Sequence, residues 1–164
     1  MRTVEEIIET HDGDYIPFYG GFMSQWFPSP FRYGPTLFPT AEHFMMAMKA
    51  KLFDDFPAQM AIMSNSDPAA AKALGRRVKG FDPRIWDVVK VATVFAGNWL
   101  KFTQHPDLRK ELLSTGKAVL VEASPTDRIW GIGMAADDHR VRKPWLWRGS
   151  NLLGFVLMEV RDRI

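Results

Sequence analysis

The sequence contains no cysteine. This absence excludes disulfide bonds, cysteine nucleophiles, zinc sites built on thiolates and iron–sulfur clusters. The four histidines are scattered, and no two of them stand three or four residues apart, as a pair of metal ligands on one helix face would. We therefore expect neither a structural metal nor a bound cofactor.

Long apolar runs are also missing, since none approaches the roughly 20 residues of a membrane-spanning helix. The opening residues, MRTVEEIIETHDGDYI, carry acids where a secretory signal would be apolar. An excess of one charge is equally absent, because 21 Lys and Arg residues nearly balance 19 Asp and Glu residues. The composition predicts a cytoplasmic protein with no membrane segment, and its charge does not require a nucleic-acid partner.

The chain has the size and composition of one globular domain, with 164 residues, 46% of them hydrophobic and 24% charged. These numbers carry no prediction of oligomeric state. Residues 17–39 combine Pro and Gly with many aromatic side chains. A flexible linker would be polar, so this segment is expected to bury its rings against the body of the protein, with short strands at 15–19 and 31–38.

Helical signals dominate the rest of the chain. Thr40 is a good N-cap for a helix that starts at Ala41, and Asp67-Pro68 and Pro106 are typical of helix starts. AVLVEAS is β-branched and bounded by turns, which indicates a strand. The predicted elements are helices at 41–52, 57–64, 68 to near 80, 83–103, 106–114 and from 151 onward, a strand at 118–124 and an irregular segment at 137–149. We expect one compact, helix-rich α+β domain with few strands.

The helix predicted at 83–103 has the clearest apolar periodicity in the chain. Its large side chains recur at steps of three and four, which predicts one buried face made of Ile85, Val88, Ala92, Phe95, Trp99 and Phe102. Gly97 interrupts this helix at a cost of about 1 kcal/mol relative to alanine. Its presence suggests close packing against a neighbouring element.

The stretch PTAEHFMMAMKAKLF, residues 39–53, places Glu42 and Lys49 seven residues apart. Seven residues are two helical turns, so both side chains leave one helix face about 10 Å apart along the axis. In the simpler interpretation Glu42 complements the helix dipole and Lys49 extends to water. In the functional interpretation both face an apolar pocket, where burial would raise the pKa of Glu42 and make Lys49 a nucleophilic amine. Spacing alone favours the simpler interpretation, and His43 is expected to face solvent or a neighbouring loop.

Three shorter motifs could bind a ligand. DRIWGIG places an acid, a tryptophan and two glycines in one loop, which could hold a planar or sugar ligand or simply form a turn with a buried Trp130. WRGSNLLG could leave helix amides free for an anion if Ser150 or Asn151 caps the final helix. Gly75-Arg76-Arg77 is typical of a helix end, and Arg76 could also contact a phosphate.

Six blocks occur in an order that resembles the NADAR, or YbiA-like, family: FYGG…SQW…SPF, PTAEHFMMAMKAKLF, AKALGRRVKGFD, KFTQHPDLRKELLSTG, LVEASPTDRIWGIG and WRGSNLLGFVLMEVRD. The resemblance covers nearly the whole chain. It implies a helix-rich α+β fold over residues 16–164, preceded by an extension at residues 1–15. It also implies N-glycosidase activity, because family members cut the bond between ribose phosphate and the amino group of early riboflavin-pathway pyrimidines.

The resemblance further implies site residues, matched by position. Glu42 corresponds to the family's acidic residue, Lys49 to the lysine of the same helix, and Asp127 to the acid before its Trp-Gly loop. These three are the expected catalytic residues, and the lysine would form a Schiff base with an opened ribose. Trp130 and Asn151 match family positions in the same way. From their side-chain chemistry, Tyr19, Trp26 and Trp130 are expected to stack on the base and Arg76 to contact the phosphate, and Gly131 completes the expected substrate-binding residues.

The leading prediction is hydrolysis of the C–N bond between ribose phosphate and the amino group of phosphoribosylaminopyrimidines, which are small nucleotide-like substrates. Breaking this bond builds positive charge on the ribose, which a carboxylate stabilises or relieves by proton transfer. One alternative is an ADP-ribosyl hydrolase that removes ADP-ribose from guanine in nucleic acid or nucleotides, and only this alternative brings in nucleic acid. A second alternative is a non-catalytic module that binds NAD or ADP-ribose.

Three departures from the family pattern are present. Ile132 stands where some members have an acid, so any role of that acid is lost or moved. Gln25-Trp26 stands where Asn-Phe is frequent, and residues 134–148 form a longer insertion; both departures could change which base is accepted.

Overall fold

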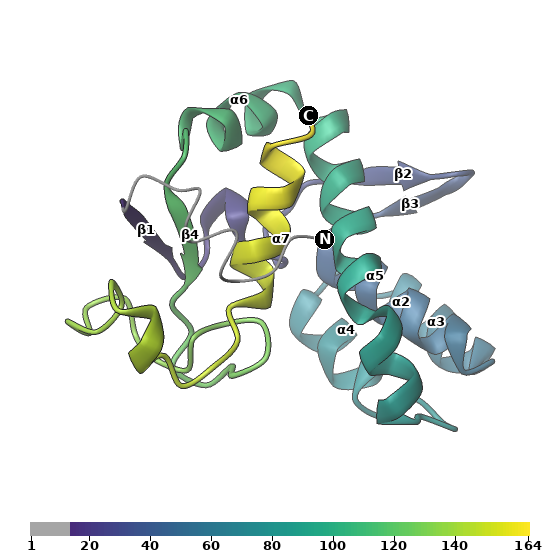
Figure 1. Cartoon of the computed structure of the whole chain (residues 1–164). Helices are drawn as coiled ribbons and strands as arrows, with labels where there is room; N and C mark the ends of the chain where they lie inside the picture. The colour runs from purple at the N-terminus through teal and green to yellow at the C-terminus, as the bar shows by residue number, and fades with distance from the viewer. Residues whose placement is uncertain (1–13) are drawn as a thin grey trace. The chain divides into compact units, whose positions relative to one another are not determined.

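The computed structural model describes residues 14–164, so the extension predicted at residues 1–15 lies almost entirely outside the described residues. The chain divides into two compact units. We call Gln25–His105 the central unit, and residues 14–24 together with Pro106–Ile164 the terminal unit. Helices predominate and the strands are few and short in both units (Figure 1), which confirms the predicted helix-rich α+β class.

The central unit is built around one buried helix. Its elements are β2 (Phe31–Tyr33), β3 (Thr36–Phe38), α2 (Ala41–Leu52), α3 (Phe56–Met63), α4 (Pro68–Gly75) and α5 (Pro83–Gln104). Helix α2 packs against the three other helices and touches β3 of the antiparallel β2–β3 hairpin. Thr40 caps α2 by accepting a hydrogen bond from the backbone N–H of His43, as predicted. These contacts bury most of α2 on every side.

The hairpin covers an aromatic cluster, which confirms the predicted burial for Phe31 and Phe38, whereas Tyr19, Trp26 and Tyr33 of the same segment are exposed. The rings of Phe31 and Phe38 both contact that of Phe44 on α2, with centroids 5.8 and 5.1 Å away. Gly97 of α5 meets the same cluster, since a Cβ at this position would lie 2.9 Å from Cδ1 of Phe44. The close packing expected at Gly97 is therefore confirmed.

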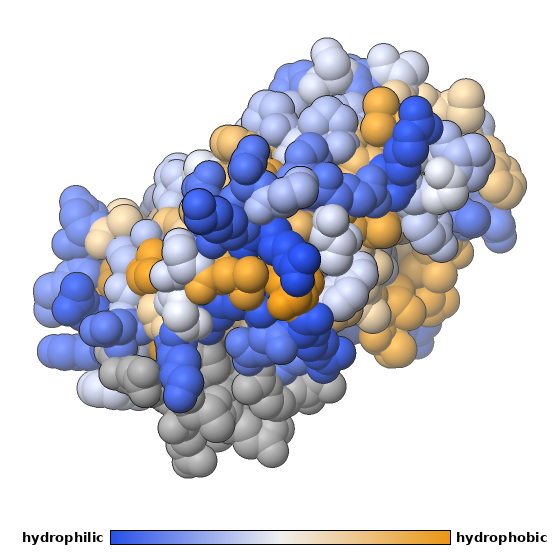
Figure 2. Space-filling model, turned by 90° about the horizontal axis from the view of Figure 1, so that it is seen from above, coloured by the Kyte–Doolittle hydropathy of each residue, from blue (hydrophilic) through white to orange (hydrophobic). Residues whose placement is uncertain are grey.

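The buried face of α5 differs from the predicted one. Ile85 and Val88 are exposed, and Val88 keeps 81% of its surface accessible. Figure 2 shows apolar residues reaching the surface among polar ones. The residues that α5 buries are Trp86, Val94, Gly97, Asn98, Lys101 and Phe102. The prediction counted only apolar side chains, whereas two polar residues occupy the buried face.

Helix α4 also ends earlier than predicted, at Gly75 rather than near Gly80. After it the chain turns so that the backbone N–H of Lys79 donates to the Asp55 carboxylate at 2.8 Å. Asp55 accepts a second hydrogen bond from the N–H of Ala58 and so caps α3. One carboxylate therefore fixes both the start of α3 and the segment that follows α4.

The terminal unit joins the two ends of the described chain. Its elements are β1 (Tyr15–Phe18), the 3-10 turn Gly21–Met23, α6 (Pro106–Ser114), β4 (Val119–Glu122), the 3-10 turn Pro144–Leu146 and α7 (Leu152–Arg161). Strand β1 pairs with β4 in parallel, with Tyr15 opposite Val119. Helix α7 lies along β4 and also contacts α6 (Figure 1). Among the described residues, no helix has the length and hydropathy needed to cross a membrane.

Gly154 marks the closest approach of α7 to β4. A Cβ here would overlap the backbone oxygen of Leu120 and lie 2.6 Å from the side-chain amide of Asn151. We expect Gly154→Ala to lower the free energy of unfolding by about 2 kcal/mol or more, although alanine is normally favoured over glycine in a helix by about 1 kcal/mol. Urea unfolding measures this loss. Lys110→Ala, on the exposed face of α6, serves as the control and should stay within about 0.5 kcal/mol of the parent. A Gly154→Ala protein as stable as the parent would contradict this packing.

Candidate active site

Glu42 and Lys49 both lie on the buried face of α2. Their exposed fractions are 2% and 9%. The backbone N–H of Glu42 donates to the carbonyl oxygen of Gln25 at 2.9 Å, so the segment before the hairpin also fixes the first turn of this helix. The simpler interpretation of the sequence, in which Lys49 extends to water, is therefore wrong.

The ammonium group of Lys49 is enclosed by aromatic rings. Its Nζ lies 4.1 Å from the ring centroid of Phe81 and 5.7 Å from that of Trp86. Burial lowers the pKa of Lys49, and the positive charge of Arg76 lowers it further, whereas the negative charge of Glu42 raises it. The net direction is downward from 10.5. A larger fraction of Lys49 is therefore an uncharged amine at neutral pH than in an ordinary lysine.

His43 faces a neighbouring loop, one of the two positions expected for it. It is fully buried, and its Nε2 lies 3.0 Å from the carbonyl oxygen of Asn65. Since a carbonyl can only accept, Nε2 carries the proton and Nδ1 accepts from the hydroxyl of Thr40 at 2.8 Å. Burial lowers the pKa of His43, which agrees with this neutral tautomer. His43 therefore has a structural role at the start of α2.

Two predicted substrate-binding residues of the central unit lie on or beside α4. Arg76, at the end of α4, is exposed and acts electrostatically on Lys49. Trp26 is 41% exposed, and the Nζ of Lys72 on α4 lies 5.8 Å from the centroid of its ring. An exposed guanidinium near a buried amine, with a partly exposed indole and a further cation in the same unit, is suited to an anionic ligand with a planar group.

Asp127 organises the loop that it begins. One of its carboxylate oxygens accepts hydrogen bonds from the N–H groups of Ile129 and Trp130, at 2.9 and 2.8 Å. Its backbone carbonyl accepts another from Gly133 at 3.1 Å. These contacts fix the DRIWGIG turn, so the structure gives Asp127 a positioning role, and a catalytic role for it stays a prediction.

Gly131 and Asn151 come together in the terminal unit. The backbone N–H of Asn151 donates to the carbonyl of Gly131 at 3.2 Å. The side-chain oxygen of Asn151 accepts from Glu122 N–H at 2.8 Å, and its amide nitrogen donates to Leu120 O at 2.9 Å. Asn151 stands at the start of α7 but makes no side-chain cap, so the capping prediction is wrong for this residue. Its amide instead joins α7 to β4, and its φ of 51° is left-handed.

The predicted residues thus fall into two groups. Glu42, Lys49 and Arg76 interact within the central unit, where Trp26 also lies. Asp127, Trp130, Gly131 and Asn151 share one loop network of the terminal unit, and Tyr19, beyond β1, is 69% exposed. Ile132, at the position where some family members carry an acid, is fully buried.

Sequence reasoning missed the aromatic enclosure of Lys49 and a second buried lysine. Lys101 of α5 is fully buried, with its Nζ 5.6 Å from the ring centroid of Phe27, and burial lowers its pKa to about 7. No pattern in the sequence separates it from a surface lysine. A buried amide pair, Gln25 and Asn98, was also missed.

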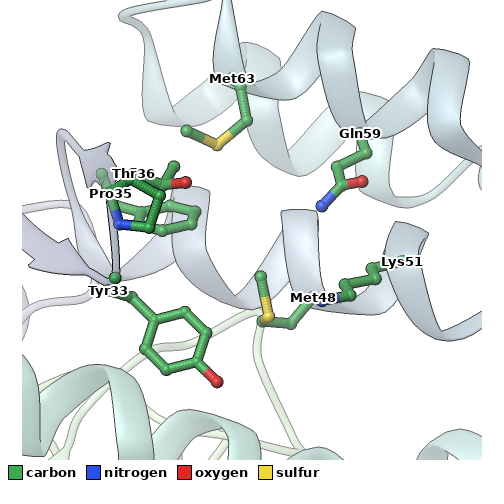
Figure 3. A pocket seen from close by; sticks show the side chains of 9 residues that line it. Tyr33, Pro35, Thr36, Met48, Lys51, Gln59 and Met63 are labelled. Atoms are coloured by element: carbon green, nitrogen blue, oxygen red, sulfur yellow. The ribbon is translucent and has the colours of Figure 1, made fainter.

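A separate hollow of about 450 Å³ lies on another face of α2. Figure 3 shows Met48 and Lys51 from α2 facing Gln59 and Met63 from α3, with Tyr33 and Pro35 of the hairpin beside them. Lys51 is nine residues after Glu42, which is half a turn out of phase on a helix. None of the predicted site residues lines this hollow.

The arrangement in the central unit combines a carboxylate, an amine with a lowered pKa and an exposed guanidinium. A carboxylate can transfer a proton, and an uncharged amine can attack an electrophilic carbon. Within residues 14–164, no three histidine or acidic side chains gather as a metal site would require. The side chains that are present are suited to nucleophilic and acid–base chemistry.

The comparisons with known proteins agree with this description. The NADAR domain family matches residues 17–164. The chain is 45% identical to N-glycosidase R617 of Acanthamoeba polyphaga mimivirus over 90% of this chain and 95% of R617. It is 31% identical to riboflavin biosynthesis protein VVA0006 of Vibrio vulnificus, over 88% of this chain and 35% of that protein.

A solved structure is also similar. The NMR structure of the E. coli protein YbiA superimposes with a TM-score of 0.76 at 30% identity, over 94% of this chain and 88% of YbiA. R617 and further curated relatives carry the name N-glycosidase, which confirms the predicted enzyme class, a hydrolase of N-glycosyl bonds. The match over nearly the whole chain, together with this shared fold, shows that the protein belongs to the NADAR family.

Proposed function

We propose that the protein hydrolyses the C–N bond between ribose 5-phosphate and the amino group of phosphoribosylaminopyrimidines. The observation that carries this proposal is the pair of Glu42 and Lys49, buried on one face of α2 and coupled through their charges. The riboflavin name of the Vibrio relative supports the pyrimidine, and the exposed Arg76 supplies a cation for the phosphate. A cytoplasmic location stays a prediction.

The proposed reaction proceeds through the opened ribose. Proton transfer from the carboxyl group of Glu42 to the ring oxygen opens the sugar and leaves an iminium bond between C1′ and the substrate nitrogen. The uncharged Nζ of Lys49 adds to C1′, a proton passes from Nζ to the substrate nitrogen, and the pyrimidine leaves as an amine when its bond to C1′ breaks. The product of this step is an imine between Lys49 and C1′ of ribose 5-phosphate.

Water completes the proposed cycle. It adds to C1′ of the imine, the C1′–Nζ bond breaks, and the aldehyde form of ribose 5-phosphate is released while Lys49 regains its amine. One water molecule is consumed for each C–N bond broken. The Glu42 carboxylate accepts the proton of this water, which returns the site to its starting protonation.

The direct test is a product assay on a substrate panel. We expect free ribose 5-phosphate and free pyrimidine from phosphoribosylaminopyrimidines, identified by mass spectrometry, and no release from ADP-ribosylated guanosine. Release of guanosine with no action on the pyrimidines would favour the ADP-ribosyl hydrolase. Tight calorimetric binding of ADP-ribose with no product from any substrate would favour the non-catalytic module.

A further inference from the structure

Two buried amide side chains meet beside the start of α2. The Nδ2 of Asn98 on α5 donates to Oε1 of Gln25 at 2.8 Å and to the carbonyl oxygen of Val94 at 2.9 Å. Since the Val94 carbonyl can only accept, the nitrogen of Asn98 must face it, and this fixes the orientation of both amides. Both hydrogens of the Asn98 nitrogen are then used.

The other ends of the two amides are unusual for buried groups. Within the part of the chain that the structure describes, neither Nε2 of Gln25 nor Oδ1 of Asn98 has a hydrogen-bond partner. The two residues are only 7% and 0% exposed. Buried polar atoms are nearly always hydrogen-bonded, because leaving them unpaired is costly. A donor and an acceptor, held together by their own hydrogen bond, are therefore left without a partner among the described residues.

The location of this pair connects it to the proposed catalytic residues. The backbone carbonyl of Gln25 accepts from the N–H of Glu42, so the two residues are in direct contact. Helices α2 and α5 run antiparallel, because Phe44 meets Gly97 near one end and Lys49 meets Trp86 near the other. Glu42 itself is 2% exposed, so a substrate that reaches its carboxylate must enter the same buried region.

We propose that Gln25 and Asn98 bind the lactam edge of the base, the adjacent C=O and N–H groups of a pyrimidinone ring. This inference rests on the proposed function and adds to it the residues that select the base. The Nε2 of Gln25 donates to the ring carbonyl, and Oδ1 of Asn98 accepts from the neighbouring ring N–H. A base whose ring nitrogen carries a methyl group has no hydrogen for Asn98, so the enzyme selects against it.

The test compares a phosphoribosylaminopyrimidine with its ring-N-methylated analogue. We expect the wild-type protein to favour the unmethylated substrate by about ten-fold to a hundred-fold in kcat/KM, as for loss of one buried hydrogen bond. Gln25→Met/Asn98→Leu keeps the volumes of both side chains but removes their hydrogen bonds. This double variant should lose the preference for the unmethylated substrate. A preference caused only by steric exclusion of the methyl group would persist in it. Gln59→Met, in the separate hollow beside α3, is the matched control and should keep the wild-type preference.

Binding of the free pyrimidine and its methylated form, measured by calorimetry, gives a readout that does not depend on turnover. Equal binding and equal cleavage of the two forms by the wild-type protein would overturn the inference and leave the proposed function intact. Preferential binding of the unmethylated form without cleavage of any substrate would support the inference and reject the proposed function. A double variant that keeps the wild-type preference, and whose thermal unfolding shows that it is folded, would also overturn the inference, because the two amides would then not select the base.

Discussion

Replacing Glu42 by glutamine is expected to lower kcat by about 10²-fold to 10⁴-fold, the range typical for loss of a general acid–base group. Glutamine keeps the size and the hydrogen-bonding shape of the side chain, but it cannot transfer a proton. The side chain is 2% exposed and its backbone N–H is held by Gln25, so the geometry of the first turn of α2 should persist. Release of ribose 5-phosphate under saturating substrate measures the effect.

Glu159→Gln is the matched control for this variant. Glu159 is a helical glutamate with the same 2% exposure, but it lies in the terminal unit and forms an ion pair with Arg163 at 2.8 Å. The side chain of Arg163 is 54% exposed, so the replacement leaves no buried unpaired charge, and kcat should be largely preserved in the folded protein. Normal turnover by a folded Glu42→Gln protein would remove Glu42 from the mechanism.

The parts of the fold that depend on neighbouring residues could be predicted from the sequence. Thr40 caps α2 where the pattern indicates, and Pro106 begins α6. Such signals act within one turn of the chain, through a side chain and the nearest backbone N–H or through a fixed φ. Strand β4 was predictable for the same reason, whereas the sequence predicted one strand over 31–38 where the structure has the β2–β3 hairpin.

The buried face of α5 could not be predicted because it depends on partners elsewhere in the chain. Asn98 is buried beside Gln25, far away in sequence, and Lys101 is buried beside the ring of Phe27. A periodicity count treats both as surface residues. The count consequently predicted a buried face that includes Val88, which is exposed in the structure.

The same limit applies to the candidate site. The spacing of Glu42 and Lys49 placed both on one helix face, but it favoured a solvated lysine. The difference comes from Phe81 and Trp86, whose rings enclose the amine, and from Arg76, whose charge reaches it. Within the sequence, only the order of the family's blocks points to this pair.

Borohydride reduction during turnover is expected to leave a ribose phosphate adduct on Lys49. The proposed imine between Nζ and C1′ is reduced to a stable amine, which peptide mapping by mass spectrometry locates. Lys49→Arg should abolish the adduct and lower kcat by about 10²-fold or more, because the guanidinium stays protonated and is not a nucleophile.

Lys101 provides the control within the same unit. Burial lowers its pKa to about 7, so it too is an uncharged amine in part at neutral pH. If a lowered pKa alone decided reactivity, the adduct would appear on Lys101 as well. We expect it only on Lys49. Turnover with no adduct on any lysine would instead favour direct attack by water.

The charges around Lys49 predict how its reactivity depends on pH. A small acylating reagent reacts only with the uncharged form of a lysine. The rate of acylation at Lys49 should therefore rise with pH and level off above the pKa of that lysine, which lies below 10.5. The positive charge of Arg76 lowers this pKa, so Arg76→Gln should move the midpoint to higher pH. The negative charge of Glu42 raises it, so Glu42→Gln should move the midpoint to lower pH, even though turnover is nearly lost. Arg77→Gln, one residue further on and also exposed, is the control for Arg76 and should leave the midpoint near its wild-type value. Identical midpoints in all four proteins would contradict the electrostatic coupling on which the Glu42–Lys49 mechanism depends.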